Sequence, residues 1–137
     1  MTRETTLAVL AYLIPTFALG YVWHLMLFTG YYESLAIYRA DIIIPLGFSS
    51  MLVQSVLFAW IFRRMFADST ASAGVLVLQY ALLGALLSWS FTTLAVAAKN
   101  IMASVPRYML IETFFTTVQW ALVAPLTVLA FRASERR

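Results

Sequence analysis

The sequence contains no cysteine and few charged residues. The lack of cysteine excludes disulfide bonds and thiolate metal sites. Charged residues make up 11% of the 137 positions, whereas a soluble domain averages about 25%. Hydrophobic residues make up 63%, and the mean hydropathy is +0.88. A soluble domain of this length has too little interior to bury so much apolar surface. The composition therefore indicates a single integral membrane domain, residues 1–137, and excludes an ordinary soluble domain.

Several motifs that carry chemistry are also missing. The sequence has no glycine-rich phosphate loop, no Ser-His-Asp pattern and no cluster of histidines. His24 is the only histidine, and zinc usually requires three or four protein ligands. A metal or a heme held through His24 is therefore disfavoured, and no cofactor is predicted. The net charge of +3 comes from basic residues in short segments between apolar runs, so no nucleic-acid partner is expected.

Four apolar segments dominate the chain, at residues 7–28, 42–62, 73–98 and 109–131. Each reaches the length of about 20 residues that a membrane-spanning helix needs. None alternates like a barrel strand, and short connections favour antiparallel neighbours. The predicted fold is all-α: an integral membrane four-helix bundle with up-down-up-down topology. The first segment is longer than the apolar region of a signal peptide, so we interpret it as the first span.

The basic residues predict the orientation of these spans. With four spans, the termini and the middle connection share one side, which carries six of the nine basic residues. The six are Arg3, Arg63, Arg64, Arg132, Arg136 and Arg137, against Arg39, Lys99 and Arg107 on the other side. The positive-inside rule then places the N- and C-termini in the cytoplasm.

The few polar residues inside the apolar segments are the candidates for function. Glu112, Thr116 and Gln119 have i, i+4, i+7 spacing, which places them on one face of the last helix. A carboxylate within a span requires a partner, so Glu112 favours a functional interpretation. For Gln119, hydrogen bonding between helices is the preferred interpretation. Gln54 shares a face of the second helix with two small residues.

We expect a polar cluster in the outer half of the bundle. Its members are His24, Glu33, Arg39, Asp41, Glu112 and Arg107, with Gln119 and Gln54 beneath them. Glu112 would carry the charge, and His24 would titrate near neutral pH. Arg39 or Arg107 would bind an anion or form an ion pair. The alternative for His24 is a structural hydrogen bond to Glu112 or to a tyrosine hydroxyl.

Two further patterns have structural interpretations. Gly84, Ser88 and Thr92 have i, i+4, i+8 spacing, which is typical of close helix packing in membranes. Several aromatic residues gather toward the predicted outer boundary, where an aromatic belt is expected. These are Tyr21, Trp23, Tyr31, Tyr32, Tyr38 and Tyr108.

Two stretches of the sequence resemble a known family. Residues 18–28 (ALGYVWHLMLF) and the start of the last span, residues 107–112 (RYMLIE), carry the resemblance. It is to small bacterial four-span membrane proteins of a domain-of-unknown-function family. The resemblance implies a four-helix fold in a bacterial cytoplasmic (inner) membrane, and it transfers no catalytic residue.

Three classes of function fit these features. The favoured one is a non-enzymatic membrane protein that binds or passes a small ligand through the outward-facing polar cluster. The second is a structural or accessory subunit of a larger membrane complex. The third is a membrane-embedded enzyme that acts on a lipid or a quinone through His24 and Glu112. In each case membrane lipids are partners, and a homo-oligomer or a membrane complex is expected.

Overall fold

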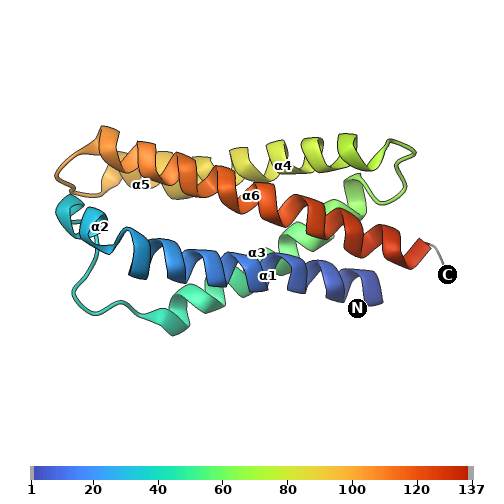
Figure 1. The fold of residues 1–137 in the computed structure, drawn as a ribbon, viewed down its shortest axis with the longest axis horizontal. Helices are drawn as coiled ribbons and strands as arrows, with labels where there is room; N and C mark the ends of the chain where they lie inside the picture. The colour runs from blue at the N-terminus through green and yellow to red at the C-terminus, as the bar shows by residue number, and fades with distance from the viewer. Residues whose placement is uncertain (1, 136–137) are drawn as a thin grey trace.

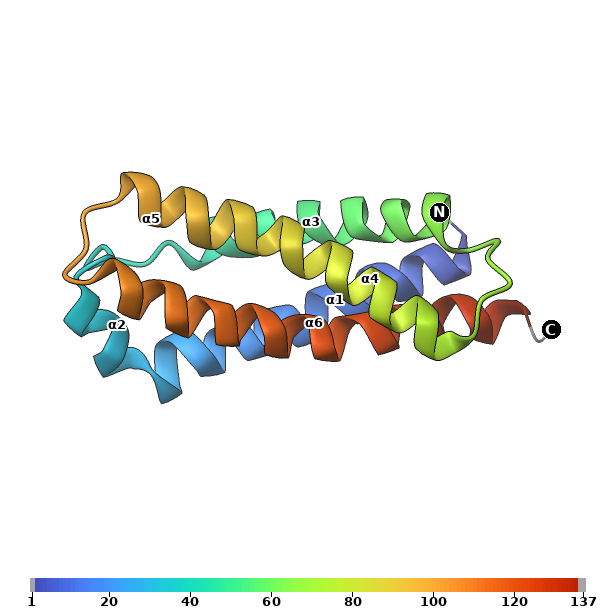
Figure 2. The ribbon, with the colours of Figure 1, turned by 90° about the horizontal axis from the view of Figure 1, so that it is seen from above.

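In a computed structural model, every regular element in residues 2–135, the part of the chain that the structure describes, is helical. Side chains are described for residues 2–132. Arg136 and Arg137, which contribute to the predicted charge asymmetry, lie outside the described residues. The prediction of an all-α fold is confirmed, and the helices run along a common long axis with both termini at the same end (Figures 1 and 2).

Four helices are long and apolar enough to cross a membrane, which confirms the four predicted segments. The first consists of α1 (Arg3–Val22) and its continuation η1 (Trp23–Leu27), and the second is α3 (Ile44–Met65). The third consists of α4 (Ala73–Trp89), η2 (Ser90–Leu94) and α5 (Ala95–Lys99). The fourth is α6 (Val105–Glu135). The observed boundaries differ from the predicted ones by at most four residues: the first helix begins four residues earlier, and α6 begins four residues earlier and ends four later.

The connection between the first two long helices contains a short helix, α2 (Thr29–Leu35). Tyr32 and Leu35 on α2 are fully buried. Ala36 ends the helix in the left-handed conformation, with φ of 56°. The backbone N–H of Ala103 donates to the Leu35 carbonyl oxygen at 2.9 Å, which joins this connection to the one before α6. The segment is thus a folded cap on one end of the molecule.

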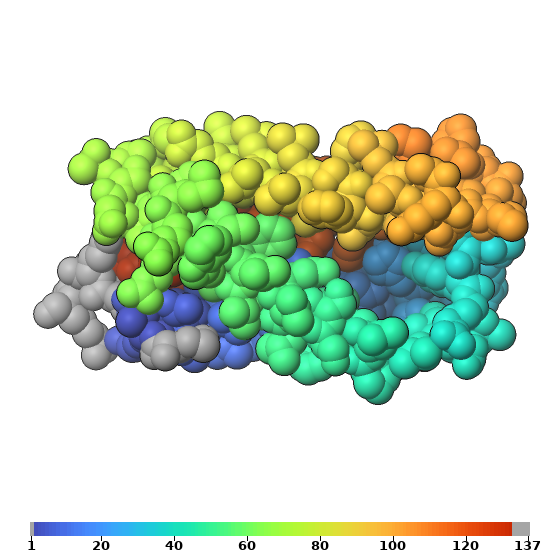
Figure 3. Space-filling model, turned by 180° about the vertical axis from the view of Figure 1, so that it is seen from behind, coloured from blue at the N-terminus to red at the C-terminus, as the bar shows by residue number. Residues whose placement is uncertain are grey.

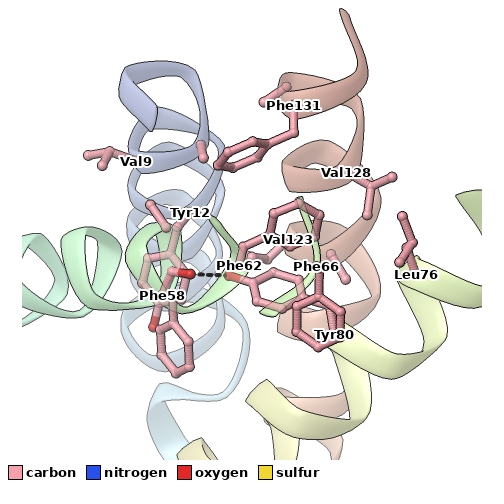
Figure 4. Packing of buried hydrophobic residues seen from close by; sticks show 14 of the residues in the cluster. Val9, Tyr12, Phe58, Phe62, Phe66, Leu76, Tyr80, Val123, Val128 and Phe131 are labelled. Atoms are coloured by element: carbon pink, nitrogen blue, oxygen red, sulfur yellow. Dashed lines mark hydrogen bonds between the residues drawn. The ribbon is translucent and has the colours of Figure 1, made fainter. Parts of the chain in front are cut away.

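The main core lies toward the end of the molecule that carries the termini. Its aromatic residues come from all four long helices and include Tyr12, Phe62, Tyr80 and Trp120 (Figure 4 labels the first three). The rings of Phe62 and Tyr80 pack edge to face, with centroids 4.9 Å apart. Tyr80 packs in the same way on Trp120, at 5.4 Å. This geometry is the preferred one for aromatic pairs and fixes the helices at this end.

The first half of α3 diverges from the rest of the bundle. All of its buried residues lie in its second half, between Ser55 and Phe62. Residues 44–50 are exposed throughout. The space-filling view shows a hollow beside this half of α3, with the first helix visible at its floor (Figure 3). The divergence leaves room between the helices at the end away from the termini.

Two of the long helices contain a π-helical turn. In η1, the Phe28 N–H donates to the Trp23 carbonyl oxygen at 3.0 Å, five residues earlier. In η2, the Ala95 N–H donates to the Ser90 carbonyl oxygen. A π-helical turn widens a helix locally and is frequent at functional sites. His24 lies in the first of these turns and Thr92 in the second.

Candidate functional site

His24, which is partly buried, and Glu112, which is buried, form a pair between the first and last long helices. The distance from His24 Nε2 to Glu112 Oε1 is 3.4 Å, and the two side chains are 19% and 8% exposed. The Tyr32 hydroxyl donates to the same carboxylate oxygen at 2.6 Å. This distance is typical of a hydroxyl bound to an ionised acceptor. The three side chains come from η1, α2 and α6, so the π-helical turn and the folded cap together position the pair.

The backbone determines which nitrogen of His24 carries a proton. His24 Nδ1 lies 2.9 Å from the Gly20 carbonyl oxygen. A carbonyl oxygen only accepts hydrogen bonds, so Nδ1 is the donor. Nε2 then faces Glu112, and a hydrogen bond between them requires one proton, held either by Nε2 or by the carboxyl group. A His24–Glu112 pair joined by this hydrogen bond shares one proton and carries no net charge.

Tyr32 is held in its protonated, donating form. Burial raises the pKa of Tyr32 far above its ordinary value, and the negative charge of Glu112 raises it further. The Tyr32 ring packs against the His24 ring with centroids 4.8 Å apart, and it stacks on Tyr38 at 5.1 Å. On the other side of His24, the Phe115 ring lies at 4.6 Å. The pair is therefore enclosed by aromatic rings.

A cavity of about 490 Å³ extends from this pair toward the centre of the molecule. This volume is within the range of about 300–1,000 Å³ that is usual for small-molecule sites. Its walls are mainly apolar, and all four long helices contribute to them. The polar residues that line it are Tyr12, Thr16, His24, Ser50, Gln54, Ser88, Thr92, Glu112 and Gln119.

The polar residues deeper in the cavity bond to one another. The Tyr12 hydroxyl donates to Gln54 Oε1 at 2.7 Å. Gln119 Nε2 lies 3.3 Å from the Tyr12 hydroxyl and 3.3 Å from Thr16 Oγ1, and donates to both. Gln54 Nε2 donates to Ser50 Oγ at 3.1 Å. Gln54 and Gln119, both predicted as candidates beneath the outer cluster, thus belong to one network that ties three helices together.

Two smaller cavities adjoin the central one at His24. One, of about 470 Å³, is bounded by η1, the segment 36–43 and the exposed first half of α3. The other, of about 380 Å³, runs from His24 and Glu112 past Tyr108 to Asn100 at the end of the molecule. His24 lines all three cavities. It therefore stands where a path from the apolar surface and a path from the end of the bundle meet.

The other charged residues of the predicted cluster do not reach this pair. Arg39 and Asp41 bind each other at 3.1 Å, and both are exposed on the segment after α2. Glu33 is exposed on α2. The Arg107 guanidinium lies over the Tyr31 ring at 4.7 Å and donates to Ser34. Of these four, Arg39 alone lines one of the cavities, so the six-residue cluster reduces to His24 and Glu112.

Two of the tyrosines lie elsewhere than the sequence predicts. Tyr32 and Tyr108 are expected in an aromatic belt, but they are 0% and 4% exposed. Their hydroxyls bond inside the protein, Tyr32 to Glu112 and Tyr108 to the Thr92 carbonyl oxygen at 2.7 Å. The belt prediction is wrong for both because α2 folds inward and η2 exposes a carbonyl group toward α6.

The predicted cluster includes His24 but omits three residues that precede it on the same face of the first helix. Tyr12, Thr16, Gly20 and His24 recur at every fourth position of the first helix, and all four line the cavity. Residues four apart lie above one another on a helix. The repeat of polar and small residues therefore marks the inward face of this helix.

Gly84, Ser88 and Thr92 lie where α4 and η2 meet the cavity and α6. Gly84 lies against the Trp120 ring. Ser88 Oγ accepts from Trp120 Nε1 at 3.0 Å and lines the cavity. The Thr92 hydroxyl donates to the Ser88 carbonyl oxygen at 2.8 Å. The first two residues thus join α4 to α6, and Thr92 forms part of the cavity wall.

Within the described residues, no group of three or more His, Asp or Glu side chains is arranged to hold a metal ion. Comparisons of the chain with protein-family models, curated proteins and solved structures found no match. The resemblance to four-span proteins of a domain-of-unknown-function family therefore stays a prediction.

Proposed function

We propose that the chain is a four-span membrane protein that binds a small, mainly apolar ligand in the cavity at the His24–Glu112 pair. The cavity itself carries this proposal. It combines apolar walls with a few convergent polar groups, as small-molecule sites usually do. A buried carboxylate in a membrane span is also costly and marks a functional site by default. Binding without catalysis is the simplest activity that these features support.

The membrane setting is supported by the outward faces of the helices. Large apolar side chains such as Ile14, Leu46 and Leu129 are more than 60% exposed. Such faces suit contact with lipid chains and are poorly suited to water. We propose that the helices cross the inner membrane of a bacterium in up-down-up-down order, with both termini in the cytoplasm. Six basic residues against three support this orientation.

The other two classes of function stay predictions. A subunit role would require a partner for the exposed apolar faces. An enzyme acting on a lipid or a quinone would use the same His24–Glu112 pair. Experiments on the purified protein alone distinguish both of these functions from ligand binding.

Equilibrium dialysis of the detergent-solubilised protein tests the proposal with three probes of related shape. They are the tetraphenylphosphonium cation, the tetraphenylborate anion and neutral triphenylphosphine oxide, with binding to empty micelles subtracted. At least one probe should bind saturably. Gly47→Phe should weaken that binding at least about tenfold, because residue 47 lines the cavity and a Cβ atom added there would meet no other atom within 4 Å.

Leu46→Phe is the matched control, since Leu46 is the neighbouring residue and its side chain is 66% exposed. This variant should bind the probe as the unchanged protein does. Absence of saturable binding for all three probes, or equal binding by the Gly47→Phe variant, contradicts the proposed function.

A further inference from the structure

We propose that the ligand is a small organic monocation with an apolar body, which binds the Glu112 carboxylate and displaces the proton shared by His24 and Glu112. This inference rests on the proposed ligand-binding function and adds the charge of the ligand. The cavity contains a net negative group only when that proton leaves, so a cation and the proton compete for the same carboxylate.

The charges around the central cavity favour a cation. Glu112 is the only acidic residue among the described residues that line the three cavities. Neither lysine nor arginine lines the central cavity. Arg39 lines the second cavity, but its guanidinium is paired with Asp41. An anionic ligand would therefore meet the Glu112 carboxylate with no lysine or arginine to balance it inside the central cavity.

The hydrogen bonds of the cavity distinguish a cation from a neutral polar ligand. Tyr12, Gln54 and Gln119 already bond to one another, so a neutral ligand would have to break this network to bond to these three side chains. At Glu112, both the Tyr32 and the His24 contacts use Oε1. Oε2 takes part in neither contact, and Glu112 lines the central cavity. The carboxylate thus has an oxygen available for a ligand.

The aromatic walls favour an organic cation over a metal ion. The rings of Phe58, Phe91 and Phe115 line the cavity, and ring faces attract cations. A metal ion would instead require several oxygen or nitrogen ligands. The described residues contain no group of three acidic or histidine side chains for that purpose. An apolar body would occupy the wide part of the cavity while the charged centre meets Glu112.

The separation of His24 and Glu112 suits an exchange of partners. Their distance of 3.4 Å is longer than the 2.7–2.9 Å that is typical of a charge-assisted hydrogen bond. A monocation that binds Glu112 takes over the charge of the imidazolium, and His24 Nε2 releases its proton to water. One positive charge enters and one leaves, so the buried site stays neutral. Neutrality matters here because an unbalanced charge in an apolar site is costly.

The charged and titratable groups around His24 indicate that the proton exchange takes place at the His24–Glu112 pair. The titratable or charged groups that line the cavities with His24 are Glu112 and Tyr108 from α6, Tyr12 and Tyr21 from the first helix, Tyr38 and Arg39 from the segment after α2. Tyr32 from α2 packs on the His24 ring. The walls from α3, α4 and η2 contain no titratable residue. Tyrosine and arginine ordinarily keep their protons at neutral pH, so the exchange falls to His24 and Glu112.

Calorimetric titration of the unchanged protein with tetraphenylphosphonium tests the exchange directly. The titration is run at about pH 6.5, near the ordinary pKa of an imidazole, in two buffers with different enthalpies of ionisation. The difference in heat should correspond to the release of about one proton per cation, and affinity should rise by up to about tenfold per pH unit where the pair holds its proton. Saturable binding without proton release overturns the inference.

Glu112→Gln tests the carboxylate. This variant should lose at least about tenfold in affinity for tetraphenylphosphonium. Glu33→Gln, the same change on the exposed face of α2, should bind the cation like the unchanged protein. A monodisperse elution profile in detergent reports on folding. Should Glu112→Gln fail to fold, the proton count on the unchanged protein still decides the question.

The other probes separate this inference from the proposed function. Equal affinity of the Glu112→Gln variant for the cation overturns the inference, as does tighter binding of tetraphenylborate than of tetraphenylphosphonium. If triphenylphosphine oxide is the only probe that binds saturably, and Gly47→Phe blocks it, the inference that the ligand is a cation is wrong. The proposed ligand-binding function is then still supported. If none of the three probes binds saturably, both the inference and the proposed function are contradicted.

Discussion

The indole ring of Trp120 lies directly against the α-carbon of Gly84. A Cβ atom on residue 84 would lie 2.1 Å from Trp120 Cη2 and 2.2 Å from Cζ3. Trp120 is 1% exposed and also bonds to Ser88 through its indole N–H. The absence of a side chain at one position of α4 thus sets how closely α4 and α6 approach, and α6 carries Glu112.

Gly84→Ala should therefore destabilise the protein. The new methyl group would force Trp120 out of its position among Tyr12, Phe58 and Tyr80. Inserting a carbon atom into a well-packed core costs about 1–3 kcal/mol. The expected result is a clearly lower midpoint of thermal unfolding in detergent, followed by tryptophan fluorescence.

Gly74→Ala provides the matched control for this prediction. Gly74 lies in the first turn of the same helix, and a Cβ atom there has open space. Alanine favours a helix more than glycine does, so the midpoint should stay unchanged or rise slightly. A Gly84→Ala midpoint equal to that of Gly74→Ala would show that the contact with Trp120 does not limit the packing.

The Tyr12 hydroxyl should contribute measurably to stability. It joins Gln54 of α3 to Gln119 of α6, so Tyr12→Phe would remove one bond to each amide. Hydrogen bonds between membrane helices are worth about 0.6–2 kcal/mol. We expect a lower unfolding midpoint for this variant. Tyr21→Phe, at a 47% exposed position of the same helix, should leave the midpoint unchanged, and an equal effect of the two changes would contradict the network.

The orientation of the spans is testable because the chain has no cysteine of its own. Ile101, in the connection before α6, is 95% exposed, and Thr70 is exposed in the connection before α4. In intact bacterial cells with a permeable outer membrane, an impermeant maleimide should label Ile101→Cys. Thr70→Cys should react only after the inner membrane is opened. The reverse labelling pattern would place the termini outside.

Much of the fold is predictable from the sequence because hydrophobicity is local. A run of about 20 apolar residues is sufficient to indicate a spanning helix, and each of the four runs corresponds to a long helix. The inward face of α6 follows from spacing alone, and Glu112, Thr116 and Gln119 are all buried. Periodicity reports which residues of one helix share a face, and this information needs no knowledge of the neighbouring helix.

The candidate site is predictable only in part. His24 and Glu112 stand out in the sequence because ionisable groups are rare in apolar segments, but the sequence does not determine whether they interact. It also suggests Glu33, Arg39, Asp41 and Arg107, which do not reach the pair. The predicted depth along the bundle is similar for all six residues, but depth does not determine whether a side chain points inward or toward solvent.

The sequence by itself determined the helical class of the protein, its four apolar segments and the short set of polar residues inside them. Composition and period decide these properties, and both are readable one segment at a time. Only the tertiary structure decided that α3 diverges, that α2 folds inward with Tyr32, and that His24 meets Glu112 across 88 positions of sequence. Those features depend on contacts between segments that lie far apart in the sequence, and these contacts bring two of the few ionisable groups together beside the central cavity.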